Sequence, residues 1–102
     1  MPYVRISLMR PKHGQEAEVD SLLDQLVDYY ASQPGYLTGY RLTNIDGTGR
    51  VGRLGVWDSA HEAEAAAQSD HDLALRSQLN FILDEDSHEE YSFEGVAREA
   101  AN

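Results

Sequence analysis

The feature that most restricts the fold is the order in which the hydrophobic pattern changes its period along the chain. Residues 3–10 alternate, with Val4, Ile6 and Leu8 on one face, which is the period-2 pattern of a strand. From Gln15 the apolar residues recur at helical spacing instead. They form one stripe made of Val19, Leu22, Leu23, Leu26, Val27 and Tyr30. The chain is therefore expected to open with a strand followed by an amphipathic helix.

Two further strands are predicted at residues 36–45 and 50–57, joined around Asp46-Gly47-Thr48-Gly49. The Asp-Gly pair supplies the positive φ angles that tight hairpin turns need. Pro34-Gly35 ends the preceding helix, so the two strands begin immediately after it. This segment is predicted to be an antiparallel hairpin.

A second helix is predicted from about residue 60, because Ser59 and Glu62 have the spacing of a capping box. Its apolar positions continue to Ile82, with a bend or break expected near Ser69. After an acidic loop, residues 91–96 alternate again and predict a last strand.

The resulting order, β-α-β-β-α-β, predicts an α+β fold of the ferredoxin-like kind. Right-handed crossovers place both helices on one face of a four-stranded antiparallel sheet. With 102 residues there is room for one domain. We expect this domain to span residues 1–96 and residues 97–102 to form a tail.

The sheet face without helices needs another cover in so short a chain. That face would carry either Val4, Ile6 and Leu8 or their neighbours on the first strand, and the apolar option favours burial. Two sheets packed face to face across a two-fold axis would bury it, so we predict a homodimer.

Charge and composition exclude several classes of partner. The chain has 18 acidic and 8 basic residues, a net charge of −10, which disfavours nucleic acid and anionic membranes as partners. The absence of cysteine excludes disulfides, thiolate nucleophiles and Cys-ligated metals. No apolar stretch has the length of a signal peptide or a membrane span, so a cytoplasmic location is expected.

Three segments, Gln33-Pro34-Gly35-Tyr36, Val56-Trp57-Asp58-Ser59 and Ser69-Asp70-His71, resemble the antibiotic biosynthesis monooxygenase family. The resemblance covers residues 3–96 and implies a dimeric α+β barrel. It also implies a pocket between the sheet and the helices that takes a small aromatic or hydrophobic molecule. Family members include cofactor-independent oxygenases, haem-degrading enzymes and proteins without an assigned activity.

The haem-degrading branch is disfavoured at three positions. Its catalytic asparagine would fall at Ser7, its tryptophan near Ala66 and its iron-ligating histidine near Arg76. No phosphate loop or nucleotide fingerprint is present either. We therefore expect a protein without a cofactor.

Two residues carry over from the resemblance as predicted catalytic residues, Trp57 and His71. The Trp57 indole N–H could bind a substrate oxygen and its ring could stack on an aromatic ligand, although a purely structural role in the core is the stronger alternative. His71 could accept a proton, or it could be an exposed residue at a helix end. No two histidines lie at the i, i+4 spacing of ligands on one helix face, so no metal site is predicted.

Three more residues complete the predicted substrate site. Tyr30 lies on the apolar stripe and is either a core aromatic or a phenol at a pocket mouth. Arg53 shares a strand face with Trp57 and could pair with an anionic substrate or, as the stronger alternative, with a helix carboxylate. Ser7 occupies the first-strand position where the haem branch has its asparagine.

Two functions remain open from the sequence. One is a cofactor-independent monooxygenase acting on a small electron-rich aromatic or quinol-like molecule, with His71 as the base. The other is a non-catalytic dimeric module that binds a small ligand or has no open pocket. An open cavity lined by Trp57 and His71 would favour the enzyme, because an enzyme requires access for its substrate.

Overall fold

The computed structural model describes residues 1–101 and confirms the predicted order of elements. The second helix is divided into two at the break expected near Ser69. The elements are β1 (Tyr3–Met9), α1 (Glu16–Ala31), β2 (Tyr36–Leu42), β3 (Val51–Trp57), α2 (Ala60–Ala67), α3 (Asp70–Ile82) and β4 (Glu89–Glu94). Residue 102, at the end of the predicted tail, lies outside the described residues.

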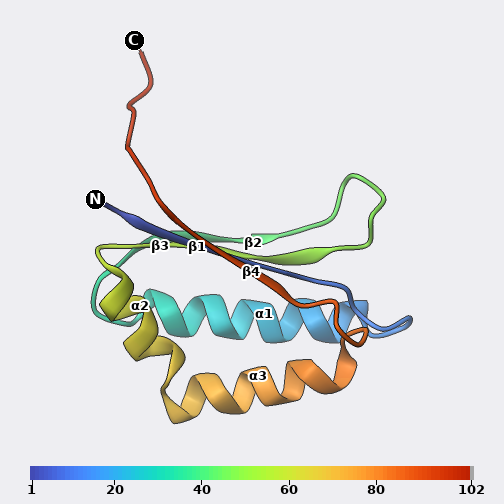
Figure 1. Cartoon of the computed structure of the whole chain (residues 1–102). Coiled ribbons are helices and arrows are strands. Elements are labelled where there is room, and N and C mark those ends of the chain that lie inside the picture. The colour runs from blue at the N-terminus through green and yellow to red at the C-terminus, as the bar shows by residue number, and fades with distance from the viewer. Residues whose placement is uncertain (102) are drawn as a thin grey trace.

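The four strands form one sheet in the order β2-β3-β1-β4, and every neighbouring pair is antiparallel. The three helices lie together on one side of this sheet (Figure 1). The ferredoxin-like α+β fold predicted from the sequence is therefore confirmed. No helix within residues 1–101 is long and apolar enough to cross a membrane.

The core lies between the sheet and α1, and the predicted helical stripe supplies most of it. Val19, Leu22, Leu23 and Leu26 are all buried. Tyr30 is buried as well, whereas its neighbour Tyr29 is only partly covered. The helix α3 packs mainly against α1, which leaves room for longer polar side chains between α3 and the β1–β4 half of the sheet.

The break predicted near Ser69 is confirmed and has a local cause. The Ser69 hydroxyl accepts a hydrogen bond from the Asp72 N–H at 3.1 Å and caps α3. Ser59 caps α2 by accepting from the Glu62 N–H. The predicted capping box is incomplete, because the Glu62 carboxylate accepts a hydrogen bond from the Ser59 hydroxyl at 3.0 Å rather than from the Ser59 backbone.

Replacing Ser69 with alanine should lower the free energy of unfolding by about 1 kcal/mol, the usual contribution of an N-cap side chain. Urea unfolding followed by circular dichroism measures it. Ser77→Ala is the matched control, because Ser77 is an exposed residue in the body of α3. Equal stability of the two variants would contradict the capping role.

The β2–β3 hairpin has a longer loop than predicted, since β2 ends at Leu42 and β3 begins at Val51. Gly47 and Gly49 have φ angles of 80° and 77°, as the Asp-Gly signal predicted. The Asp46 carboxylate accepts hydrogen bonds from the side chains of Asn44 and Thr48 and from the Thr48 N–H. These bonds lower the pKa of Asp46 to about 2. They take the place of the backbone hydrogen bonds that the longer predicted strands, 36–45 and 50–57, would have formed next to the turn.

The two faces of the sheet differ in character. On β1, Ser7 and Met9 face the helices and are buried. The opposite face of β1 carries Val4, Ile6 and Leu8, the residues considered from the sequence for the sheet face without helices. Across the four strands this face comprises Val4, Ile6, Leu8, Tyr40, Leu42, Leu54, Val56, Tyr91 and Phe93. We call this set the open face, because no helix within residues 1–101 packs over it (Figure 1).

Candidate functional site

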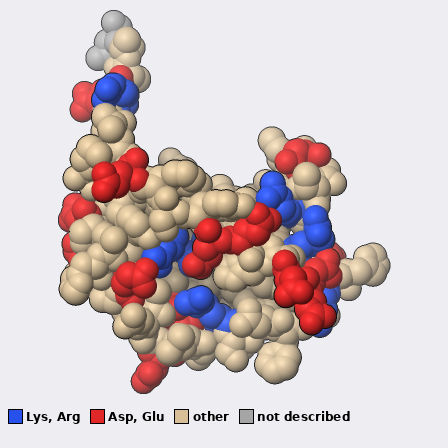
Figure 2. Space-filling view, viewed as in Figure 1, with Lys and Arg blue, Asp and Glu red and all other residues tan. Residues whose placement is uncertain are grey.

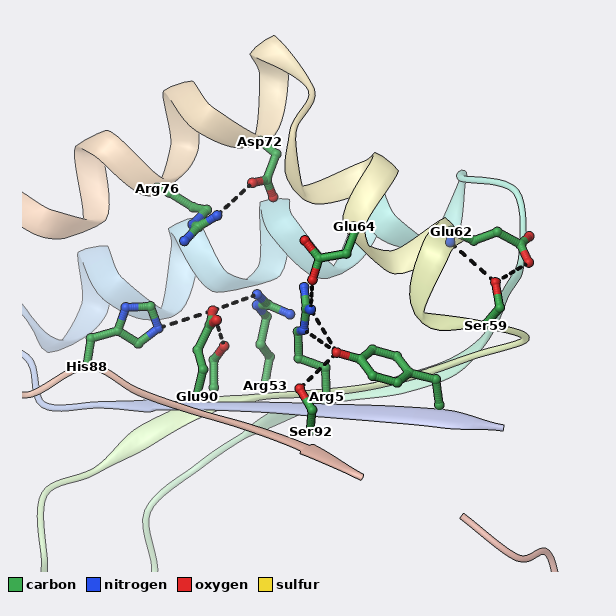
Figure 3. Close-up of polar contacts among 12 residues, drawn as sticks. Arg5, Arg53, Ser59, Glu62, Glu64, Asp72, Arg76, His88, Glu90 and Ser92 are labelled. Carbon is green, nitrogen blue, oxygen red and sulfur yellow. Dashed lines mark hydrogen bonds and ion pairs between the residues drawn. The ribbon is translucent and has the colours of Figure 1, made fainter. Parts of the chain in front are cut away.

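A row of polar residues crosses the buried face of the sheet. Ser7 of β1 pairs in register with Arg53 of β3 on one side and with Glu90 of β4 on the other. Ser7 is 0% exposed and Arg53 is 6% exposed. Figure 3 shows the Arg53 and Glu90 side chains pointing from the sheet toward the helices. The row therefore places a cation and polar oxygen atoms between the sheet and the helices, where side chains are normally apolar.

The Arg53 guanidinium is poorly paired for a buried cation. It lies over the ring of Tyr30, with 4.7 Å between its central carbon and the ring centroid. Its nearest acid is Glu90, at an N–O distance of 4.0 Å, which is too long for a hydrogen bond. The same Glu90 oxygen accepts the Ser7 hydroxyl at 3.2 Å. The predicted pairing of Arg53 with a helix carboxylate is thus replaced by a long contact to a strand residue.

Trp57 forms the aromatic wall of this region. It is 2% exposed and meets the rings of Tyr30 and Tyr36 edge-to-face, with centroids 5.8 Å and 5.2 Å away. Such pairs stabilise a core beyond the area that they bury. The structure therefore brings together four of the five predicted site residues: Ser7, Tyr30, Arg53 and Trp57.

Asp72 of α3 belongs to the same cluster, and the sequence prediction missed it. It is 0% exposed, and its Oδ1 accepts a hydrogen bond from the Tyr30 hydroxyl. Its Oδ2 is buried without a hydrogen-bond partner among residues 1–101, although Arg76 Nη1 lies 3.6 Å away. Burial raises the pKa of the Asp72 carboxyl and also that of the Tyr30 phenol.

The sequence did contain a signal for Asp72. Asp72, Leu75 and Leu79 are spaced three and four residues apart, so Asp72 lies on the buried stripe of α3. A single acid on an apolar helix face is unusual unless the carboxylate has a partner. In this protein the partner is the Tyr30 hydroxyl, which comes from another helix.

Charged residues continue from the cluster toward solvent (Figure 3). The side chains of Arg76, His88 and Glu90 are about one-third exposed, and His88 Nε2 lies 3.6 Å from Glu90 Oε1. Burial is the main cause that lowers the pKa of His88. A small cavity of about 70 Å³ lies beside them, lined by Met9, Arg76, Leu79, Asn80, Leu83 and His88. Figure 2 shows acidic and basic side chains side by side on this face.

Beside the row, two residues from Ser7 along β1, Arg5 forms an ion pair between the sheet and α2. The Arg5 guanidinium donates to Glu64 of α2 and to the Tyr3 hydroxyl. The hydroxyls of Tyr3 and Ser92 are 2.8 Å apart, which extends the network to β4. Three arginines, Arg5, Arg53 and Arg76, thus surround the space between the sheet and the α2–α3 pair (Figure 3).

His71 is not in this cluster. It is exposed at the start of α3, and its ring lies against Tyr29 with centroids 4.6 Å apart. The rings of Tyr29 and Tyr30 separate it from Trp57. A cavity of about 350 Å³ lies on this side, lined by Tyr29, Gln33, Pro34, His61, Glu62, Ala65, Ala66 and Ser69.

The comparisons with known proteins identify the family. The family model described as antibiotic biosynthesis monooxygenase matches residues 2–77. The chain belongs to this family. Among solved structures, the chain resembles SnoaB, a cofactor-independent oxygenase from Streptomyces nogalater, at 20% identity with a TM-score of 0.78, covering 97% of this chain and 95% of SnoaB. A search of curated proteins found no match.

Two other structures show the same fold. Rv0793 from Mycobacterium tuberculosis is 17% identical with a TM-score of 0.84, and 98% of this chain and 100% of Rv0793 are covered. A conserved protein from Methanosarcina mazei Go1 is 14% identical with a TM-score of 0.84, and 94% of each chain is covered. At these identities the likeness establishes the fold of this antibiotic biosynthesis monooxygenase family member and not its substrate.

Access to the cluster is limited in this family member. Neither Trp57 nor His71 lines the cavities described above or a third one of about 190 Å³, which lies beside the open face around Val4 and Val56. Within residues 1–101, no group of three or more His, Cys, Asp or Glu side chains is placed to hold a metal ion. A ligand that contacts Trp57 would therefore need the side chains around it to move.

Proposed function

We propose that the protein is a cofactor-independent monooxygenase that acts on a small electron-rich aromatic molecule of the phenol or quinol type. The observation that carries the proposal is the buried cluster of Ser7, Tyr30, Arg53 and Trp57 in a member of the antibiotic biosynthesis monooxygenase family. Burying polar groups destabilises a fold unless they are well paired, and Arg53 is not. Structural resemblance to the oxygenase SnoaB supports the same proposal.

Ground-state oxygen reacts slowly with closed-shell molecules, so the substrate must be able to give up an electron, as a phenolate or enolate does. This chemistry sets three requirements for the protein: it must remove a proton from the substrate, stabilise the resulting anion and exclude water. Trp57 offers an aromatic face and an N–H donor, while Arg53 offers a cation. Two side chains of α3 could take the proton, the predicted His71 and the buried Asp72.

The proposal includes a homodimer formed by the open face. A contiguous apolar surface on a short chain favours association with a partner of matching shape, and a second copy supplies one. The most exposed members are Tyr40 and Phe93, at 62% and 54%. Face-to-face packing of two such sheets would bury them and give the dimeric α+β barrel that the sequence resemblance implies.

A second candidate, a non-catalytic binding module, is favoured by one observation. The cluster residues are 0–6% exposed, and Trp57 lines none of the three cavities described above. Filled sites of this kind suit a structural role. The two candidates differ in whether the protein consumes oxygen.

The enzyme proposal predicts oxygen uptake above the buffer rate with anthrone-type and dihydroxynaphthalene substrates, followed with an oxygen electrode. Trp57→Phe should slow uptake about tenfold or more, because it removes the indole N–H and reduces the stacking surface. Phe81→Leu is the matched control, since Phe81 is 78% exposed on α3 and should not affect the rate.

The His71→Ala variant then tests the predicted base. Loss of a general base typically costs about a hundredfold or more in rate. An unchanged rate would remove His71 from the mechanism and leave Asp72. No uptake by the parent protein with either substrate class would replace the enzyme proposal with the binding module.

A further inference from the structure

A second site lies on the helix side of the molecule, away from the polar cluster. It is the cavity of about 350 Å³ between the end of α1 and α2. We propose that this cavity binds a small arylalkylammonium ion, a molecule with a protonated amine on a short chain attached to an aromatic ring. The argument has three parts: the separation of the cavity from the cluster, its apolar walls and one fixed carboxylate.

Two adjacent tyrosines of α1 separate the cavity from the cluster. Tyr30 faces the cluster, where its hydroxyl donates to Asp72. Tyr29 lines the cavity, and its ring is braced by His71 with 4.6 Å between the ring centroids. Adjacent residues on a helix point about 100° apart, which explains why the two phenols face different regions. A ligand in the cavity would therefore contact Tyr29 without entering the cluster.

The walls of the cavity suit an aromatic body. Tyr29 supplies a flat ring, Pro34 supplies an apolar ring at the end of α1, and Ala65 and Ala66 supply small side chains from α2. Small-molecule sites typically have volumes of about 300–1,000 Å³, so this cavity has room for a ligand of one aromatic ring. Ala65 is exposed and Ala66 is buried, so the cavity extends from the surface toward the core.

The fixed carboxylate is Glu62. Its Oε1 accepts a hydrogen bond from the Ser59 hydroxyl at 3.0 Å. Its other oxygen lies against Gly35, in space that the Cβ of any other residue would occupy, and Gly35 has a φ angle of 84°. Figure 3 shows Glu62 and Ser59 together at the start of α2, away from His88 and Glu90. The carboxylate is therefore held in the cavity wall by α2 and by the loop after α1.

Glu62 has no ion-pair partner within residues 1–101. An ionised carboxylate has about four acceptor positions, and Ser59 uses one of them. Surface ion pairs are usually weak because two mobile side chains must be ordered. Here the carboxylate is already ordered, so an ammonium N–H that binds to it forms a charge-assisted hydrogen bond without that loss of freedom.

The surroundings disfavour an anion in the same place. Helix starts usually attract anions, but at the two starts beside the cavity Ser59 and Ser69 cap the helices, and Glu62 and Asp70 occupy the first turns. Within the described part of the chain, no lysine or arginine lines the cavity. The net charge of −10 also attracts cations to the surface. A cationic ligand is thus favoured over a neutral or anionic one of the same shape.

Three probes with the same ring and different charge test this inference: benzylamine, benzyl alcohol and benzoate. Titration of the 15N-labelled protein, followed by NMR, measures binding and location together. Benzylamine should bind with a dissociation constant of about 1 mM or below, as expected for a ligand of this size. Benzyl alcohol should bind about tenfold more weakly and benzoate not at all. The signals that move should belong to residues 29–34 and 61–69.

Two variants test the charge and the shape separately. Glu62→Gln should weaken benzylamine binding about tenfold and leave benzyl alcohol unchanged, because glutamine has a similar shape and is also accepted at this capping position. Glu18→Gln is its control, since Glu18 is an exposed acid in the first turn of α1. Ala65→Leu should fill the cavity and weaken both ligands about tenfold, whereas Ala74→Leu, at an exposed position on α3, should weaken neither.

Several results would overturn the inference. They are absence of benzylamine binding at millimolar concentration, benzoate binding as tight as that of benzylamine, and a Glu62→Gln or Ala65→Leu variant that binds benzylamine like the parent. Signals that move around Ser7 and Glu90 instead would place the ligand in the polar cluster and overturn it as well. If Glu62→Gln does not fold, the three probes and Ala65→Leu still decide. The readout is ligand binding and not oxygen uptake, so the result is independent of the proposed oxygenase.

Discussion

A single arginine in place of Leu54 should dissociate the proposed homodimer into monomers. Leu54 lies on the open face, between Ile6 of β1 and Tyr40 of β2. In a face-to-face dimer the new guanidinium would be enclosed between two apolar sheets. Because the dimer has two-fold symmetry, the interface would contain two such guanidinium groups, one from each protomer. An unpaired buried charge costs several kcal/mol, so the dissociation constant should rise about a thousandfold or more. Gel filtration coupled to light scattering measures the mass.

The control for this prediction is Leu73→Arg. Leu73 is also an exposed leucine, at 50%, but it lies on α3, on the helix side of the sheet. This variant should remain a dimer. If Leu73→Arg dissociates while Leu54→Arg does not, the copies meet through their helices. A monomeric parent at high concentration would contradict the barrel itself.

The fold was predictable because its signals are local and agree with one another. The period-2 segments and the helical stripe through Leu26 matched the order of elements, and Gly47 has the positive φ angle expected of the Asp-Gly turn. The strand ends were less predictable, since β2 stops at Leu42 and the last strand is Glu89–Glu94 instead of 91–96. What the pattern could not decide was which face of β1 meets the helices. The uniformly apolar face of Val4, Ile6 and Leu8 looks like a core face in isolation, yet the structure buries Ser7 and Met9 instead. Register and partner helices settle that choice, and neither is local.

The sequence predicted the site residues whose positions follow from the strand and helix periodicities. Arg53 and Trp57 share a face because they are four residues apart on one strand, and Tyr30 joins them because it ends the buried stripe of α1. His71 was predicted from a short motif, without a rule for its direction. Adjacent residues on a helix point about 100° apart, so the helix that turns Asp72 inward leaves His71 outside.

The same limit applies to the charges of the site. The sequence showed arginines scattered among acids, without indicating which pairs would form. The structure pairs Arg41 with Asp20 and Asp24 at the surface, but leaves the buried Arg53 with a single distant acid. Salt bridges between distant segments depend on the packing of side chains, and hydrophobic periodicity carries no information about them.

Adding one methyl group at Gly52 should lower the free energy of unfolding by about 3 kcal/mol or more, because overpacking of a close-packed region is costly. Gly52 of β3 pairs with Leu8 of β1, and a Cβ there would overlap the Ser7 carbonyl oxygen. That oxygen belongs to the backbone of a central strand, so it cannot rotate away as a flexible side chain would. The strands would have to separate at the point where Ser7 enters the polar row.

Urea unfolding of Gly52→Ala against Gly95→Ala measures this effect. Gly95 follows β4, and the nearest side-chain atom to an added Cβ is Val4 Cγ2 at 3.4 Å, an ordinary contact. Its substitution should change stability by no more than about 0.5 kcal/mol. If Gly52→Ala is as stable as Gly95→Ala, then β1 and β3 are not held at the spacing described, and the alignment of Ser7 with Arg53 would have to be revised. A large difference confined to Gly52 would show that the fold depends on the close approach of the two central strands beside Ser7.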